Sequence, residues 1–245
     1  MPFTFSHPAI VLPATLLPKR TYSLTGLVIG SITPDFEYFI RMKGLSVYSH
    51  TLSGLLWFDI PVGFLLAFIY HSVIRDALFS NLPGVFQTRL SQFSKFDWPE
   101  YLKTNLIIVI ISLLIGAASH LFWDSFTHGN GYFIQFFPIL NHEIMLFNIT
   151  KPLYNICQHL STIVGGLVVL CYIFRLPSDR QYKQTFNLYY WIYIAVISLT
   201  IFLLRIAFGF YSKSIEQTIV IIIASGLIAL TVTSYLFKTK FAPIK

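Results

Sequence analysis

The fold is decided by one apolar stretch in the middle of the chain, Thr104–Phe126, which reads TNLIIVIISLLIGAASHLFWDSF. From Thr104 to Ser119 it contains no ionisable side chain. An α-helix needs about 20 mostly apolar residues to cross the hydrocarbon core of a bilayer. The stretch therefore predicts a membrane-spanning helix with His120 and Asp124 near one end.

Four further segments meet the same criterion of length and hydropathy. They are Ser53–Ile74, Leu153–Phe174, Asn187–Phe208 and Ile215–Phe237. No segment alternates with a period of two, as the strands of a membrane β-barrel would. We therefore predict an all-α, polytopic membrane bundle of five transmembrane helices. It forms a single domain over residues 1–245, with its motifs in residues 1–165 and two C-terminal spans in residues 187–245.

The composition agrees with this prediction. Hydrophobic residues make up 55% of the chain and charged residues 11%, where soluble globular proteins carry about 25% charged residues. The mean hydropathy is +0.68. These values exclude a disordered chain and an ordinary soluble enzyme. The net charge of +7 comes from too few charges for a nucleic-acid-binding surface, and the predicted partner is the lipid bilayer.

Two short apolar runs, Pro8–Pro18 and Leu24–Ile32, precede the first span and are separated by Lys19 and Arg20. Each run is too short to cross a bilayer. We expect a helical hairpin that packs on or partly into the bundle. A secretory signal is excluded, because no basic region precedes the apolar run and no small-residue cleavage site follows it.

Basic residues in the loops predict the orientation. Ten lie on one side of the predicted spans: Arg75, Arg89, Lys95, Lys103, Arg175, Arg180, Lys183, Lys238, Lys240 and Lys245. Four lie on the other side: Arg41, Lys43, Lys151 and Lys213. Because cytoplasmic loops carry the excess of Lys and Arg, we predict a cytoplasmic C-terminus. The segment before the first span and the loop Thr127–Pro152 then face outward.

The histidines and carboxylates gather at this outer boundary. His120, Asp124 and His128 follow one another at one-turn spacing, so they share one helix face. Imidazole and carboxylate at this spacing let a helix present several ligands to one or two metal ions. His50 precedes the first span and His159 lies in the first turns of the third, so both reach the same boundary.

If the N-terminal hairpin turns at Lys19 and Arg20, the residues at its two ends also face outward. The predicted metal ligands are then His7, Asp35, His50, His120, Asp124, His128 and His159. The candidate catalytic residues are Asp35 and Asp124. The alternative for His120 and Asp124 is a purely structural hydrogen bond.

The other ionisable or aromatic residues near the spans have structural interpretations. His71 is expected to snorkel at the cytoplasmic end of the first span. Asp59 is expected to satisfy backbone donors freed beside Pro61. Arg205 is expected to pair with a neighbouring carboxylate or to snorkel, and Trp123 to be an interfacial aromatic.

Several short motifs resemble an uncharacterised bacterial membrane-protein family, a domain of unknown function of the 4184 type. They are Phe5-Ser6-His7-Pro8, Gly30-Ser31, Pro34-Asp35-Phe36, Ser49-His50-Thr51, the run from His120 to His128, and Gln158-His159 with Ser161-Thr162. That family is similar to membrane-bound metal-dependent hydrolases. The resemblance implies a bacterial cytoplasmic membrane protein that uses a divalent metal.

A more distant similarity is to zinc-dependent phospholipase C. Its ligands follow the order His, Asp, His, then His-x3-Asp with a further His, which His7, Asp35, His50, His120, Asp124 and His128 reproduce. The final His of that group is followed four residues later by Glu, whereas His159 is followed by Ile163. The resemblance therefore implies one or two zinc ions and not three.

The leading hypothesis is a metal-dependent hydrolase of a phosphoester or lipid-type substrate at the outer face of the membrane. Asp35, His50, His120 and Asp124 would hold one ion, which would acidify a water. Asp124 would bridge to a second ion held by one of the remaining histidines, or Asp35 would instead be the general base. The alternatives are a non-enzymatic protein with a structural metal or a metal or proton path, and a family member that only binds lipid.

Overall fold

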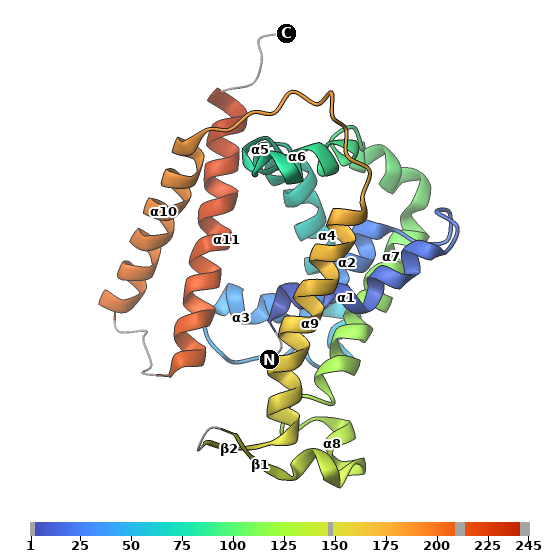
Figure 1. Cartoon of the computed structure of the whole chain (residues 1–245), viewed down its shortest axis with the longest axis vertical. Coiled ribbons are helices and arrows are strands. Elements are labelled where there is room, and N and C mark those ends of the chain that lie inside the picture. The colour runs from blue at the N-terminus through green and yellow to red at the C-terminus, as the bar shows by residue number, and fades with distance from the viewer. Residues whose placement is uncertain (1–2, 147–148, 209–213, 241–245) are drawn as a thin grey trace. The chain divides into compact units, whose positions relative to one another are not determined.

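A computed structural model describes residues 3–146, 149–208 and 214–240 of the chain (Figure 1). Five helical segments within these ranges are long and apolar enough to cross a membrane: Leu55–Asn81, Trp98–Asp124, Leu153–Arg175, Leu188–Ala207 and Ile215–Lys238. Each overlaps one predicted span, so the prediction of an all-α, polytopic bundle is confirmed. Lys213 and Lys245, which the loop-charge argument uses, lie outside the described residues.

The first span is the least regular. It consists of η4 (Leu55–Asp59), α4 (Ile60–Ile69), η5 (Tyr70–Ile74) and α5 (Arg75–Asn81), and both η4 and η5 are π-helical turns. The turn η4 ends two residues before Pro61, whose ring would clash with the carbonyl four residues earlier in a regular α-helix. The helix also continues past Ile74, its predicted end. This is possible because Arg75 donates to the carbonyl oxygens of Ser94 (3.0 Å) and Phe96 (2.6 Å).

The described chain divides into two compact units. The first comprises residues 1–35, 48–63 and 102–172, and the second comprises residues 36–47, 64–101 and 173–245. Every predicted metal ligand falls in the first unit. The single-domain organisation of the sequence analysis stays a prediction.

The predicted N-terminal hairpin is present in the first unit as α1 (Pro8–Val11), η2 (Leu12–Leu16) and α2 (Leu24–Ile32), with α1 packed on α2. Ser23 caps α2 by accepting a hydrogen bond from the Gly26 amide, while its own amide donates to Ser112 of α7 (Trp98–Asp124). A Cβ at Gly116 would lie 2.5 Å from the carbonyl oxygen of Leu27. Glycine is therefore required where α2 and α7 approach most closely.

The segment after α7 was predicted as an outer loop, but it contains regular structure. Helix α8 (Tyr132–Phe136) and η7 (Pro138–Asn141) lead into an antiparallel hairpin of β1 (Glu143–Leu146) and β2 (Ile149–Pro152). The rings of Phe126 and Phe133 stack with their centroids 4.4 Å apart, which fixes α8 against the end of α7. Helix α9 (Leu153–Arg175) follows directly. Strands this short carry too few residues for a periodic hydrophobic pattern to be recognised.

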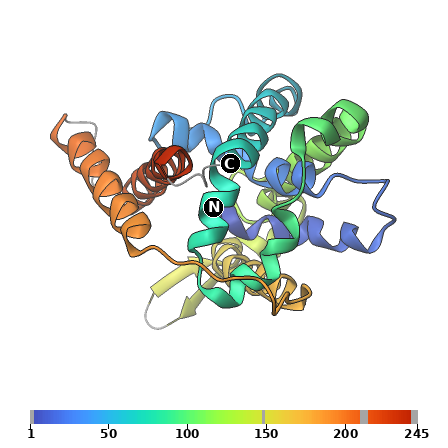
Figure 2. The same ribbon diagram turned by 90° about the horizontal axis from the view of Figure 1, so that it is seen from above.

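The second unit contains α3 (Phe36–Arg41), α6 (Gly84–Leu90), η6 (Ser91–Phe93), α10 (Leu188–Ala207) and α11 (Ile215–Lys240). Helices α10 and α11 lie side by side in both views (Figures 1 and 2). The Tyr190 hydroxyl and the Ser234 hydroxyl are 2.8 Å apart between them. Arg205 donates to the backbone carbonyl of Arg41 at 3.3 Å, so a carbonyl oxygen is one of its partners.

Candidate metal centre

The structure brings five of the predicted ligands together in the first unit. His7 is the N-cap of α1, and Asp35 ends the short helix η3 (Thr33–Asp35) that follows α2. His50 lies in the turn before the first span, and His120 and Asp124 occupy successive turns at the end of α7. The cluster therefore combines residues from three separate parts of the chain.

Four side-chain atoms of this cluster face one another. His120 Nε2 lies 3.5 Å from Asp35 Oδ1 and 3.4 Å from Asp124 Oδ2. His50 Nε2 lies 3.7 Å from the same oxygen of Asp35 and 3.6 Å from the same oxygen of Asp124. A tetrahedral ion with its ligands about 2.0–2.2 Å away holds neighbouring ligand atoms roughly 3.3–3.6 Å apart. The separations of the two histidine nitrogens from the carboxylate oxygens are close to these values, and His50, His120 and Asp124 form a group whose three ligand atoms all lie within 4.8 Å of one another.

Burial makes these atoms costly without a cation. The side chains of Asp35 and His120 are 0% exposed. Asp35 Oδ1, His120 Nε2 and Asp124 Oδ2 are buried and make no hydrogen bond. A buried polar atom without a partner destabilises a fold by about 1–3 kcal/mol, and more if it is charged. A cation bound in either group of metal-ligand spacing would give a partner to His120 Nε2 and to a carboxylate oxygen.

The hydrogen bonds on the other ring nitrogens fix the orientation of the imidazoles. His120 Nδ1 lies 2.8 Å from the carbonyl oxygen of Ser31. Since a carbonyl only accepts, Nδ1 carries the proton, and in a neutral ring the Nε2 lone pair points at the carboxylates. His50 Nδ1 lies 3.0 Å from the Ser49 hydroxyl, which leaves Nε2 on the cluster side. Metal-ligating histidines are held in this way by a partner on the second nitrogen.

The second oxygen of Asp124 faces two other histidines. His7 Nε2 lies 3.2 Å from Asp124 Oδ1, and the His7 ring stacks on His120 with centroids 3.7 Å apart. His128 Nδ1 lies 3.7 Å from the same oxygen. Residues His7, Asp35 and His120 also form a second group with metal-ligand spacing. The residue that the two groups share is His120, and Asp124 belongs only to the group with His50.

The protonation states outside the membrane spans suit metal binding. Burial lowers the pKa of His7, with a further lowering from His120, and burial also lowers the pKa of His128. Burial by itself would raise the pKa of Asp35, but positive charge on the adjacent rings of His120 and His7, when they are protonated, and the contact with His120 bring that pKa below its ordinary value. Neutral imidazole and ionised carboxylate are the forms that bind metal ions.

Two predicted ligands belong to neither group of metal-ligand spacing found among the described residues. Helix α7 ends at Asp124, but His128 still lies beside that residue, with its Nδ1 3.1 Å from the Asp124 carbonyl oxygen and 3.7 Å from Asp124 Oδ1. His159 is exposed on α9 and belongs to neither group of metal-ligand spacing found among the described residues. The neighbouring Thr162 instead binds the N-terminal segment. Its hydroxyl accepts from the Phe3 amide and its carbonyl accepts from the Ser6 hydroxyl, which anchors the segment that carries His7.

Two residues beside the cluster were not predicted to take part in it. The Thr4 hydroxyl donates to Asp35 Oδ2 at 2.5 Å. The ring of Trp123 meets the ring of His7 edge-on, with centroids 5.9 Å apart, so Trp123 is more than an interfacial aromatic. Neither position carries a signal in the sequence, because threonine and tryptophan are common in membrane helices and near their ends.

His71 and Asp59 lie apart from the groups with metal-ligand spacing. His71 belongs to the second unit, where it stacks on Trp98 at 5.0 Å and its Nδ1 lies 3.3 Å from Arg75 Nη1. Asp59 is buried at the end of η4, two residues before Pro61. Neither residue belongs to the groups with metal-ligand spacing that the described part of the chain contains.

Comparison with known proteins places this cluster in a family. No curated protein and no solved structure matches the chain. The similarity to metal-dependent hydrolases and to zinc-dependent phospholipase C therefore rests on the sequence motifs alone. A family model described as "Domain of unknown function (DUF4184)" matches residues 1–235, which include every residue of the cluster. The chain belongs to the DUF4184 family.

Proposed function

We propose that this protein is a membrane-embedded, metal-dependent hydrolase of a phosphoester or lipid-type ester. The observation that carries the proposal is that the Nε2 atoms of His50 and His120 each lie 3.4–3.7 Å from carboxylate oxygens of Asp35 and Asp124, in two groups with metal-ligand spacing. His120 and Asp124 lie within the segment Trp98–Asp124, which has the length and hydropathy of a membrane span, and ionisable side chains in such a segment are costly and indicate function.

The type and exposure of the ligands favour a catalytic over a structural ion. Structural zinc sites are closed and mostly use thiolates, whereas this set contains imidazoles and carboxylates, which suit zinc, manganese or iron. The side chain of His50 is 21% exposed, while those of Asp35 and His120 are not exposed. Among these three side chains, only that of His50 reaches the surface, although its Nε2 is buried.

A divalent ion held by these four residues, with zinc as the first candidate, would supply a Lewis acid and lower the pKa of a water towards neutrality. In the hydrolysis, the water oxygen forms a bond to the phosphorus or carbonyl carbon, and the ester bond to the leaving oxygen breaks. The proton released from the water passes to a carboxylate, and the leaving oxygen departs as an alcohol after taking up a proton. If His50, His120 and Asp124 alone hold the ion, Asp35 is the candidate proton acceptor, because the Thr4 hydroxyl holds its Oδ2 and its Oδ1 faces the cluster.

The excess of basic residues in one set of loops supports an orientation with the cluster at the outer face of a bacterial cytoplasmic membrane. His50 and Asp124 lie next to the ends of the spans Leu55–Asn81 and Trp98–Asp124, so a lipid or a lipid-linked phosphoester at that boundary is within reach. The C-terminus is then cytoplasmic.

The test is hydrolysis by purified protein in detergent or nanodiscs. Wild type loaded with zinc or manganese is assayed on an aryl phosphate and on a phospholipid, beside His120→Ala, Asp124→Ala and the control His71→Ala. Turnover that is lost in the first two variants and retained in the control supports the proposal. A wild-type protein that binds metal and turns over neither class of ester contradicts it.

The buried Asp59 favours one rival function. It lies inside the first span and in the same unit as the cluster, and a path for metal ions or protons needs ionisable groups at several depths. Uptake of metal ions into proteoliposomes distinguishes transport from hydrolysis. Metal uptake that is lost in Asp59→Asn, without hydrolysis, would establish transport. A protein that does neither would be a lipid-binding or structural member.

A further inference from the structure

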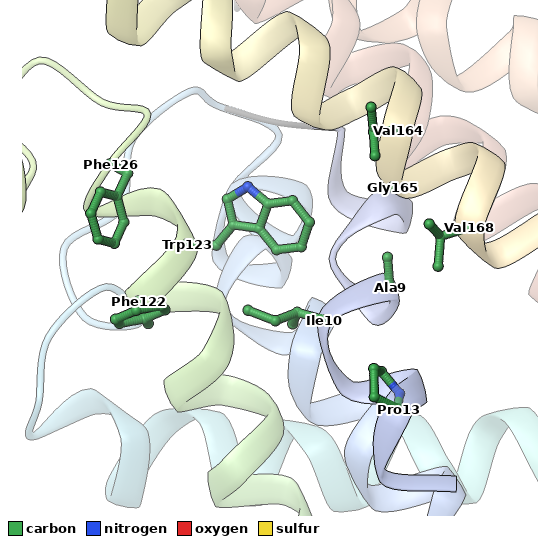
Figure 3. A pocket seen from close by; sticks show the side chains of 9 residues that line it. All are labelled: Ala9, Ile10, Pro13, Phe122, Trp123, Phe126, Val164, Gly165 and Val168. Atoms are coloured by element: carbon green, nitrogen blue, oxygen red, sulfur yellow. The ribbon is translucent and has the colours of Figure 1, made fainter. Parts of the chain in front are cut away.

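An apolar groove lies beside the metal cluster in the first unit (Figure 3). It has a volume of about 480 Å³, within the roughly 300–1,000 Å³ of typical ligand pockets. Three segments line it: the N-terminal helices, the end of α7 and the middle of α9. Its residues are Ala9, Ile10, Pro13, Phe122, Trp123, Phe126, Val164, Gly165 and Val168.

The groove is continuous with the surface that meets the bilayer. Helices α7 and α9 both have the length and hydropathy of membrane spans. On α9, Val164 is 55% exposed and Val168 is 41% exposed, so the wall of the groove runs directly into an open apolar helix face. In hydrocarbon no water fills such a hollow, because water finds no polar partners there. Its natural occupant is the hydrocarbon chain of a lipid.

The groove and the cluster share a wall. Trp123 lines the groove (Figure 3), directly precedes Asp124 and touches the edge of the His7 ring. On the other side, Gly165 allows α9 to approach the N-terminal segment, since a Cβ there would lie 2.8 Å from the carbonyl oxygen of Ser6. The side chain of Trp123 therefore lies between the groove and His7.

We propose that this groove binds one hydrocarbon chain of a membrane lipid and holds the ester of that lipid at the His/Asp cluster. The substrate class is then a lipid with a long aliphatic chain and a phosphoester or acyl ester at its head, and Trp123 is the residue that separates chain from cluster. The assignment as substrate rests on the proposed hydrolase function. Binding of the chain rests on the groove alone.

The first test is photolabelling in nanodiscs with a phosphatidylcholine that carries a diazirine in one acyl chain. The label is expected in peptides that contain Phe122, Trp123 and Val168. Val164→Trp places a large ring in the groove and removes the label. Leu167→Trp is the matched control, because Leu167 is 54% exposed on the same helix and does not line the groove. It leaves the label in place.

A second measurement links the groove to catalysis. Blocking the groove removes the burial of several methylene groups, so Val164→Trp should raise KM for a long-chain phospholipid by about tenfold or more. KM for a short-chain, water-soluble ester should stay unchanged, as should the metal content. Leu167→Trp should change none of the three.

The failures are distinguishable. Label spread evenly over the exposed face of α9, with both tryptophan variants reducing it equally, means ordinary annular lipid and overturns the groove. Specific labelling by a wild type that holds metal but hydrolyses no ester overturns the proposed function and the substrate assignment while chain binding stands. Loss of metal in Val164→Trp would show that this variant disturbs the cluster. The labelling experiment is then repeated with Val168→Trp, which also places a tryptophan in the groove.

Discussion

Replacing His120 by alanine removes the one imidazole nitrogen that lies within 3.5 Å of oxygens of both central carboxylates, Asp35 and Asp124. The ring is fully buried, and its other nitrogen is held by the Ser31 carbonyl at 2.8 Å. If a divalent ion occupies the cluster, the variant keeps three of the four converging ligands. Loss of a partner that merely orients a ligand weakens metal binding by 10–100-fold. Loss of the ligand itself should therefore weaken it by at least about 100-fold, or ~2.7 kcal/mol.

The same substitution has a different effect if the cluster is only a network of hydrogen bonds and ion pairs. His120 would then be an imidazolium between two carboxylates. Removing one partner of a buried ion pair typically destabilises a protein by about 3–5 kcal/mol, and this loss would not depend on metal. The two explanations therefore predict the same direction of change in stability but a different dependence on a chelator.

Two measurements distinguish the metal site from the hydrogen-bond network. They are thermal unfolding in detergent, with zinc and with a chelator, and elemental analysis of the purified protein. An ion at 100 times its Kd stabilises the folded state by about 2.7 kcal/mol. Wild type should therefore unfold at a lower temperature in chelator, and His120→Ala should unfold at one temperature in both buffers. His71→Ala, in the second unit, should behave as wild type.

A wild type that contains no metal, even after addition of zinc or manganese, would refute the metal site. So would a wild type whose unfolding temperature ignores the chelator, or a His120→Ala protein that binds metal as tightly as wild type. In each case the convergence of the four atoms would have to be explained by protonated histidine instead.

Three further substitutions test the surroundings of the cluster. Thr4→Val removes the hydroxyl that donates to Asp35 Oδ2 and should weaken metal binding by roughly 10–100-fold in a chelator competition, whereas Thr4→Ser should not. His159→Ala should leave the metal content unchanged, because that side chain lies on the exposed face of α9, and a fall in metal content would place it at the site after all. Gly116→Ala forces a Cβ against the backbone of α2 and should destabilise the protein by about 1–3 kcal/mol. Gly226→Ala, whose Cβ would meet nothing within 4 Å, should be neutral or slightly stabilising in the same unfolding assay.

The sequence by itself determined the five spans, because hydropathy is a local property and a bilayer demands a fixed length of apolar helix. It also determined that His120 and Asp124 share a helix face, since one-turn spacing follows from helix geometry. The same spacing leaves His128 beside Asp124, with its Nδ1 3.7 Å from Asp124 Oδ1, although α7 itself ends at Asp124. Where a helix ends depends on the contacts that α8 and Phe133 make with it, and these are not local.

Only the tertiary structure decided which distant residues join that pair. His7 contacts Asp124, which is 117 positions away in the sequence, and His120 contacts the Ser31 carbonyl oxygen, which is 89 positions away. These contacts depend on glycines such as Gly116, which let the N-terminal hairpin approach α7. His50 and His159 looked equivalent in the sequence, yet one faces the cluster and the other lies exposed on α9. The physical reason is that hydrophobic pattern selects the face a helix buries, whereas close packing of backbone against backbone selects its neighbour.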